Sequence, residues 1–97
     1  MKRFADLIER QLAMFTEDNA ELIAACLDAE RAYDRAGREE AEERYAEYLE
    51  LVEEAGEALQ EIRVTYAATL DPEDARAYER AFDREATHRF PRFELGL

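Results

Sequence analysis

A heptad pattern between Ala41 and Thr69 is the feature that most constrains how this chain can fold. Small, apolar and tyrosine side chains recur there at alternating steps of four and three: Ala41, Tyr45, Tyr48, Val52, Ala55, Leu59, Ile62, Tyr66 and Thr69. A repeat of about 3.5 residues is typical of a helix with one stripe packed against other helices. The opposite face carries a row of acids: Glu39, Glu43, Glu47, Glu50, Glu54, Glu57 and Glu61. We therefore predict a long helix over residues 38–69.

A similar pattern precedes this helix. It reads Met1, Ala5, Ile8, Leu12, Phe15, Asn19, Leu22, Cys26, Ala29, Tyr33 and Ala36. Because its phase passes unbroken through residues 16–19, it predicts one continuous helix over residues 3–36, with a kink as the alternative. Asn19 lies on the stripe itself, where a buried Asn often fixes register or oligomeric state. The alternative for Asn19 is a local kink at which its side chain reaches water. Gly37 is expected to end the helix in the left-handed conformation.

A third, shorter helix is predicted over residues 72–89. Asp71 is suited to the N-cap and Pro72 to the first helical position. Phe90 precedes Pro91, which disfavours helical backbone at Phe90. The predicted fold class is all-α: one helical domain over residues 1–90, built as an antiparallel hairpin of two long helices plus a shorter third helix. The C-terminal tail, residues 91–97, either folds back on this three-helix bundle or docks on a partner, and folding back is favoured.

Self-association is predicted because the third helix can cover only half of the hairpin and leaves apolar surface exposed. A chain of 97 residues also buries a modest share of its surface. Arg76, Arg80, Arg84 and His88 form a basic ridge on the third helix. This ridge could pair with the glutamate row of a second copy, which would add specificity. We therefore expect a homodimer or a higher oligomer. The candidate interface residues are Asn19, Tyr45, Tyr48, Val52, Arg76, Arg80, Arg84, Phe93, Leu95 and Leu97.

The net charge of −12 argues against direct binding to nucleic acid or to an anionic membrane surface, since both require positive charge.

Cys26 is the only cysteine, so the chain can form no internal disulfide, which fits a reducing cytoplasm. The longest apolar run, Leu22 to Leu27, is too short for a signal-peptide core or a membrane span. The sequence therefore predicts a cytoplasmic protein that does not enter a membrane.

One segment suggests an enzyme. Carboxylates at positions i, i+1 and i+4 of a helix can converge on a hard cation such as Mg²⁺. Leu51-Val-Glu-Glu-Ala-Gly-Glu-Ala-Leu59 resembles the first metal-binding helix of the all-α MazG-type nucleotide pyrophosphohydrolases, which carry an E-E-x-x-E segment. The resemblance implies that Glu53, Glu54 and Glu57 bind Mg²⁺ for hydrolysis of a nucleoside triphosphate to its monophosphate. It covers only this segment.

The second motif of that family, E-x-x-D on a partner helix, has no counterpart in this chain. The nearest acids, Asp71 with Asp74 and Glu79 with Asp83, do not fit it. The alternative interpretation of the segment is a solvated helix face, since Glu54 and Glu57 lie opposite the apolar stripe.

A second metal-binding pattern is Glu85-x-x-His88. Glu-x-x-His on a helix supplies two ligands to the carboxylate-bridged di-iron sites of ferritin-like bundles. Such a site needs a second pair, which a homodimer would have to supply because the chain has one histidine. The alternative is that His88 lies at the surface near a helix C-terminus, where its charged form is favourable.

The sequence thus favours a non-enzymatic helical interaction or scaffold protein that acts as a homo-oligomer, has no cofactor and binds a further protein. One alternative is the Mg²⁺-dependent pyrophosphohydrolase. Another is an acidic surface that mimics nucleic-acid phosphates and occupies a basic groove on another protein, with an affinity that falls steeply with salt.

Overall fold

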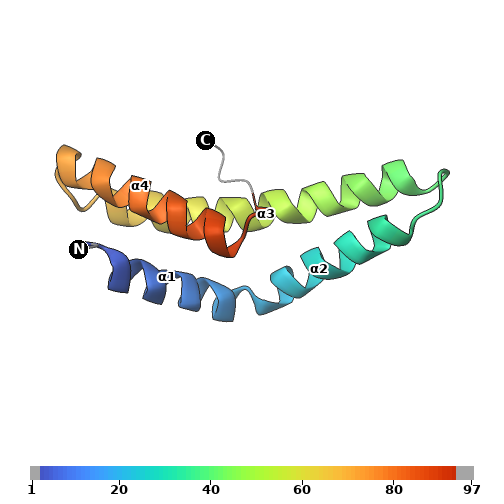
Figure 1. Cartoon of the computed structure of the whole chain (residues 1–97), viewed down its shortest axis with the longest axis horizontal. Helices are drawn as coiled ribbons and strands as arrows, with labels where there is room; N and C mark the ends of the chain where they lie inside the picture. The colour runs from blue at the N-terminus through green and yellow to red at the C-terminus, as the bar shows by residue number, and fades with distance from the viewer. Residues whose placement is uncertain (1–2, 94–97) are drawn as a thin grey trace.

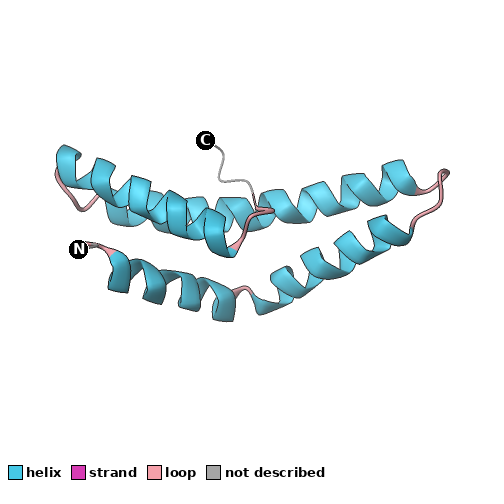
Figure 2. Cartoon of the chain, viewed as in Figure 1, coloured by secondary structure: helices cyan, strands magenta, loops and turns pink. Residues whose placement is uncertain are grey.

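A computed structural model describes residues 3–93, and the regular structure within them is entirely α-helical (Figures 1 and 2). The four helices are α1 (Ala5–Asp18), α2 (Ala20–Arg35), α3 (Ala41–Ala67) and α4 (Pro72–Arg89). The all-α prediction is confirmed. The predicted number of helices is wrong, because the first predicted helix is two helices, α1 and α2. No described helix is both long and apolar enough to cross a membrane.

The bundle is three helices thick at one end and two at the other. In Figure 1, α1 and α2 run along one side, α3 returns antiparallel to them, and α4 reverses again beside the C-terminal half of α3. α4 contacts α1 and α3, whereas α2 packs mainly on α3. The result is an elongated body of 51 × 23 × 21 Å. We call the part built from α2 and the N-terminal half of α3 the two-helix end.

The core is concentrated at the three-helix end. Its buried side chains come from one stripe of each helix there: Ile8, Leu12 and Phe15 of α1, Val52, Ala55, Leu59 and Ala67 of α3, and Tyr78, Phe82 and Ala86 of α4. α2 contributes one buried residue, Cys26. Full burial of a large apolar side chain stabilises a fold by about 1.5–3 kcal/mol. Most of the stabilisation from apolar burial therefore comes from the three-helix end.

The helix is interrupted at Asn19, between α1 and α2. The prediction of one continuous helix is therefore wrong, and its alternative, a kink, is right. The backbone of Asn19 departs from helical geometry, with φ −118° and ψ 27°. Its amide nitrogen and its side-chain Nδ2 both donate to the Phe15 carbonyl, at 2.9 and 3.0 Å. At the break, the Phe15 carbonyl thus accepts from both the backbone and the side chain of Asn19. The break lies close to Phe90, which follows α4 and packs on Phe15. α1 therefore packs against α4, whereas α2 packs mainly on α3.

The turn between α2 and α3 differs from the predicted one. Ala36 ends α2 in an extended conformation, with φ −68° and ψ 141°. Gly37 is not left-handed, so that prediction is wrong. The Gly37 carbonyl instead accepts hydrogen bonds from the amides of Glu40 and Ala41, at 3.1 and 3.0 Å. This turn delays the start of α3 to Ala41.

The start and end of α4 coincide with the predicted residues. Asp71 Oδ1 accepts a hydrogen bond from the Asp74 amide at 3.0 Å, and Pro72 is the first helical residue. After α4 the chain turns back on the bundle. The rings of Phe90 and Phe93 are stacked, with centroids 5.3 Å apart, and both lie edge-on to Phe15. The tail therefore folds back as far as Phe93. The candidate interface residues Leu95 and Leu97 lie outside the described residues.

Candidate interaction surface

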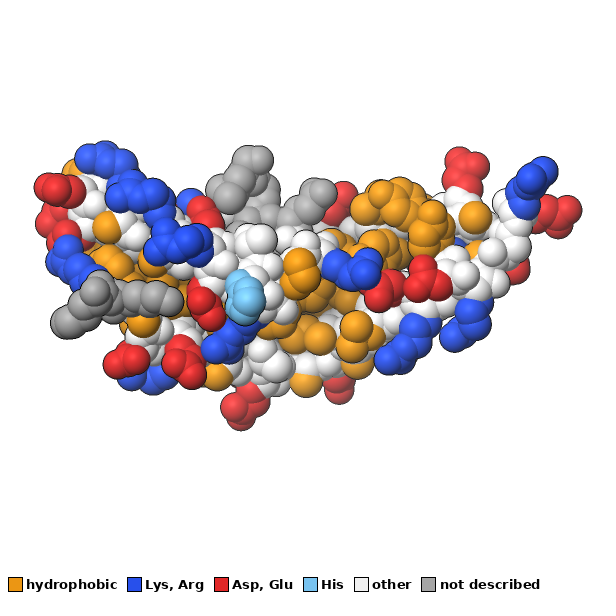
Figure 3. Space-filling view, in the orientation of Figure 1, with side chains coloured by type: hydrophobic (Ala, Val, Ile, Leu, Met, Phe, Trp, Pro, Cys, Tyr) orange, Lys and Arg blue, Asp and Glu red, His pale blue; other side chains and the backbone are white. Residues whose placement is uncertain are grey.

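Large apolar side chains remain exposed at the two-helix end. Leu27 and Tyr33 of α2 are 48% and 39% exposed, and Tyr45 of α3 is 45% exposed. The tyrosines form a continuous row, because the Tyr33 and Tyr45 ring centroids are 5.3 Å apart and those of Tyr45 and Tyr48 are 6.5 Å apart. Figure 3 shows hydrophobic side chains gathered over this end of the molecule. We call the surface formed by Leu27, Tyr33, Tyr45, Tyr48, Phe90 and Phe93 the aromatic face.

An apolar hollow of about 230 Å³ joins the row of tyrosines to the end of α4. Leu27 and Tyr48 line it from α2 and α3, and Phe90 and Phe93 line it from the turn that follows α4. The hollow thus begins where α4 ends. The aromatic face occupies the position that a longer α4, or a helix from another chain, would cover.

The turn after α4 is joined to α2 by Arg92. The Arg92 Nε lies 2.7 Å from the Glu30 carboxylate on α2. The pKa of Arg92 is raised above its ordinary value, first by the hydroxyl of Tyr48 and then by the charge of Glu30. Because the Arg92 side chain is 67% exposed, this ion pair contributes little to stability.

Cys26 lies in the wall of the same hollow and is 3% exposed. Burial raises the pKa of its thiol, and the nearby charge of Glu54 raises it further. Because the thiolate is the reactive form, a raised pKa and low exposure disfavour a nucleophilic role. Cys26 serves as a small apolar side chain that packs in the core.

A basic ridge runs along the outer side of α4. Arg76, Arg80 and Arg84 are all exposed, and within residues 3–93 none of them forms an ion pair. Several acids of α4 are paired elsewhere: Asp83 and Glu79 with Arg63, Asp74 with Arg3, and Glu85 with Arg89. The outer side of α4 is therefore locally basic on a chain whose net charge is −12. In Figure 3, Lys and Arg side chains gather on the side of the molecule where α4 lies.

The glutamates of the E-E-x-x-E segment are all exposed. Glu53, Glu54 and Glu57 lie along α3, beside the buried Val52 and Ala55. Within residues 3–93 no group of three His, Cys, Asp or Glu side chains is placed to hold a metal ion.

Within residues 3–93, Glu85 and His88 are not grouped with a third side chain that could complete a metal site. Glu85 is half-buried beside α1 and lies 3.7 Å from the guanidinium of Arg89. His88 is exposed, as expected for a histidine in the last turn of a helix.

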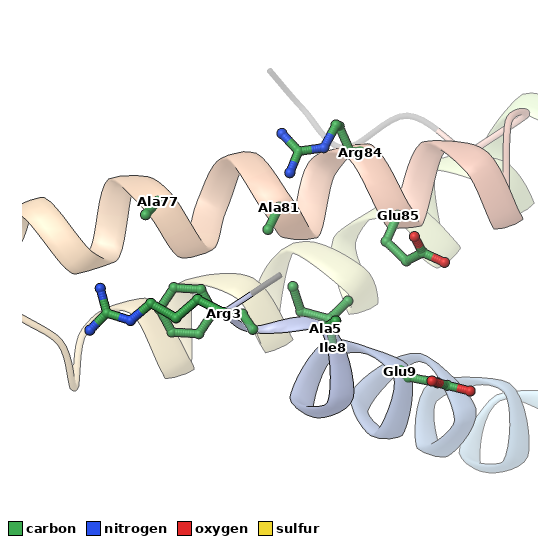
Figure 4. Close-up of a pocket in the computed structure, with 9 residues that line it drawn as sticks. Arg3, Ala5, Ile8, Glu9, Ala77, Ala81, Arg84 and Glu85 are labelled. Atoms are coloured by element: carbon green, nitrogen blue, oxygen red, sulfur yellow. The ribbon is translucent and has the colours of Figure 1, made fainter. Parts of the chain in front are cut away.

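A groove of about 370 Å³ separates α1 from α4 (Figure 4). Ala77 and Ala81 point from α4 toward α1 (Figure 4), and Arg84 and Glu85 also line the groove from α4. Arg3 lies at one end and binds Asp74 across the two helices at 2.7 Å. The alanines allow α1 and α4 to approach, and the ion pair joins their ends.

The predicted interface residues are partly assembled by the fold. Tyr45 is exposed and Tyr48 is half-buried on the aromatic face, with Phe93 beside the hollow. Val52 is 3% exposed, so it belongs to the core of the chain and not to an exposed interface. Asn19 uses its side-chain amide within the chain.

Leu27 and Tyr33 were missed as interface candidates. The sequence did carry a signal for them: both belong to the part of the hairpin that the 18-residue α4 cannot reach.

Comparison with protein-family models, curated proteins and solved structures gives no significant match to this chain.

Proposed function

We propose that this protein is a non-enzymatic helical interaction module that acts as a homo-oligomer, with its copies joined through the aromatic face. The observation that carries the proposal is the exposure of Leu27, Tyr33 and Tyr45 beside an apolar hollow. Contiguous exposed apolar surface of this kind marks interaction sites in soluble proteins. Tyrosine is also enriched at interfaces, because its ring packs while its hydroxyl remains hydrated.

The shape of the chain supports self-association. A second copy placed on the aromatic face would give the two-helix end the third layer of helices that α4 supplies at the other end. Each large apolar side chain that becomes fully buried would contribute about 1.5–3 kcal/mol. The apolar residues of α2 would gain the most buried surface, since α2 has one buried residue in the isolated chain.

The distribution of charge favours an antiparallel pair with two-fold symmetry. In such a pair the same surface of each copy faces the other, with its direction reversed. The basic ridge of α4 in one copy would then lie toward the two-helix end of its partner, where Glu39, Glu43 and Glu50 are exposed. Arginines can bind glutamates there. These charge pairs would add specificity for the antiparallel arrangement more than they would add affinity.

The proposal is tested by light scattering coupled to gel filtration on Tyr45→Glu. A charge placed among the tyrosines is expected to shift the protein toward monomer, because the interface would have to bury it unpaired. Val64→Glu is the matched control, since Val64 is 51% exposed on the same helix, away from the aromatic face. An equal shift in both variants, or in neither, would overturn the assignment of this surface. Far-UV circular dichroism checks that both variants remain helical.

We also propose that the protein works in a reducing compartment such as the cytoplasm. The single, buried cysteine supports this, because the chain has no disulfide to form. Cell fractionation with an antibody against the protein tests the location, and recovery in an oxidising compartment would contradict it.

A further inference from the structure

A second apolar groove, of about 590 Å³, lies between α1 and α3. Phe15, Ile62 and Tyr66 line its interior, and Met14 stands at its edge with 62% of its surface exposed. No residue of α4 lines this groove, although α4 packs against the same two helices. The groove therefore lies on the side of the α1–α3 pair that α4 does not cover. It shares no residue with the aromatic face.

Acidic side chains surround this groove. Asp18 and Glu61 line it directly. Beside the break at Asn19 it adjoins a hollow of about 610 Å³ lined by Glu17, Asp18, Glu21 and Glu54. Within residues 3–93 none of these acids forms an ion pair. An apolar floor with unpaired acids at its edges is complementary to a ligand that is apolar on one side and positively charged at its flanks.

We propose that the α1–α3 groove binds a basic amphipathic helix of a partner protein. Such a helix would place apolar residues at i, i+3, i+4 and i+7 on Met14, Ile62 and Tyr66, which is the general mode of helix-in-groove recognition. Its lysines and arginines would lie toward Asp18 and Glu61, and this charge complementarity would speed association and select the partner. Met14 suits the edge of such a site, since an unbranched thioether adapts to different ligand shapes.

The dimensions set the length of the partner helix. The groove follows α3 from Ala58 to the end of the helix at Ala67, which corresponds to about 15 Å of helix at about 1.5 Å per residue. The partner helix would therefore contact the groove over about three turns.

A second copy of this chain is a poor occupant of this groove. α4 carries a row of arginines, but its apolar face (Tyr78, Phe82 and Ala86) is buried in its own bundle. α4 therefore cannot present an apolar side and a basic side together. α2 also carries Arg31 and Arg35, but its exposed apolar residues, Leu27 and Tyr33, belong to the aromatic face. The proposal is thus separate from self-association through the aromatic face.

The experiment uses a labelled synthetic helix of leucine and lysine, about 18 residues long, with leucines on one face only. Its affinity is measured by fluorescence anisotropy against the full chain, Met14→Arg and Val64→Arg. Both variants add one positive charge at an exposed apolar position, but only Met14 lines the groove. Met14→Arg is expected to weaken binding by about tenfold or more, which corresponds to about 1.4 kcal/mol. Val64→Arg is expected to change the affinity by less than about twofold.

Three results would overturn the proposal. Equal weakening in both variants would mean non-specific attraction to an acidic surface. Equal affinity for a leucine–glutamate helix would remove the role of charge. A change in the oligomeric mass of Met14→Arg would assign the groove to a second copy.

A second pair of variants covers the case in which Met14→Arg fails to fold, as judged by circular dichroism. In that pair Glu61→Lys reverses a charge in the groove and Glu43→Lys reverses one outside it. Only Glu61→Lys is expected to weaken binding, and an equal effect of Glu43→Lys would overturn the proposal.

Discussion

Arg63 of α3 binds Asp83 of α4 through two parallel hydrogen bonds. Its Nε donates to Oδ1 at 2.7 Å and its Nη2 donates to Oδ2 at 3.0 Å. Glu79 adds a third oxygen, 3.6 Å from Nη1. The Arg63 side chain is 12% exposed, so water competes little for these bonds. Two-bond arginine–carboxylate pairs combine strength with fixed geometry, and this pair sets how α4 lies along α3.

Removal of the Asp83 carboxylate is expected to destabilise the fold measurably. Asp83→Ala leaves a partly buried guanidinium with the more distant Glu79 alone, which should lower the free energy of unfolding by about 1–3 kcal/mol. Urea denaturation measures the loss. Asp28→Ala is the matched control, because the Arg31–Asp28 pair is 63% and 78% exposed and should contribute little. If both variants lose the same amount, the Arg63–Asp83 pair does not fix α4.

The N-cap of α4 is the next test. Asp71→Ala removes the acceptor for the Asp74 amide and should lower the free energy of unfolding by about 1 kcal/mol. Asp71→Ser keeps a side-chain oxygen at the cap and should retain most of that stability. Equal denaturation midpoints for Asp71→Ala and the unmodified protein would contradict the role of this cap.

Tyr78 should make stability depend on pH in the alkaline range. Its ring is fully buried, and burial raises the pKa of its hydroxyl to about 12, although the hydrogen bond to Gln11 acts in the opposite direction. Because the folded state favours the neutral hydroxyl, this contribution is complete below the ordinary pKa of 10 and is lost as pH rises toward 12.

Urea denaturation at several pH values between 9 and about 12 measures this dependence. Tyr78→Phe should show a smaller fall in the free energy of unfolding over this range. Tyr45→Phe, at an exposed tyrosine, should keep the full fall. Identical pH profiles for Tyr78→Phe and the unmodified protein would contradict the assignment to Tyr78.

The turn after α4 should contribute to the core as well as to the aromatic face. Phe90 lies 5.3 Å from Phe15 and 5.3 Å from Phe93, measured between ring centroids. Phe90→Ala should therefore lower the free energy of unfolding by about 1.5–3 kcal/mol. Thermal denaturation followed by circular dichroism measures it. An unchanged midpoint would mean that the turn does not pack on α1 in solution.

The helices were predicted best where local chemistry determines them. Val52, Ala55 and Leu59 repeat at heptad spacing and are buried, and Asp71 with Pro72 marks the start of α4. The turn at Gly37 was predicted less well. Glycine permits a left-handed conformation but does not require it, and the chain ends α2 by extending Ala36 instead.

The break at Asn19 depends on packing between distant segments. A one-residue interruption keeps Phe15 and Cys26 on the same side of the chain, so the heptad phase could not distinguish a continuous helix from a kink. The exposure of Leu27 and Tyr33 is similarly a consequence of where α4 ends, in space as well as in sequence. The start of α4, by contrast, follows from a short-range signal, the Asp71 cap and Pro72.

Sedimentation equilibrium of the unmodified protein at micromolar concentration tests the central claim most directly. Association through the aromatic face predicts an average mass of at least twice that of one chain, which should fall toward the monomer mass in Tyr45→Glu. A single-chain mass throughout the micromolar range would contradict self-association.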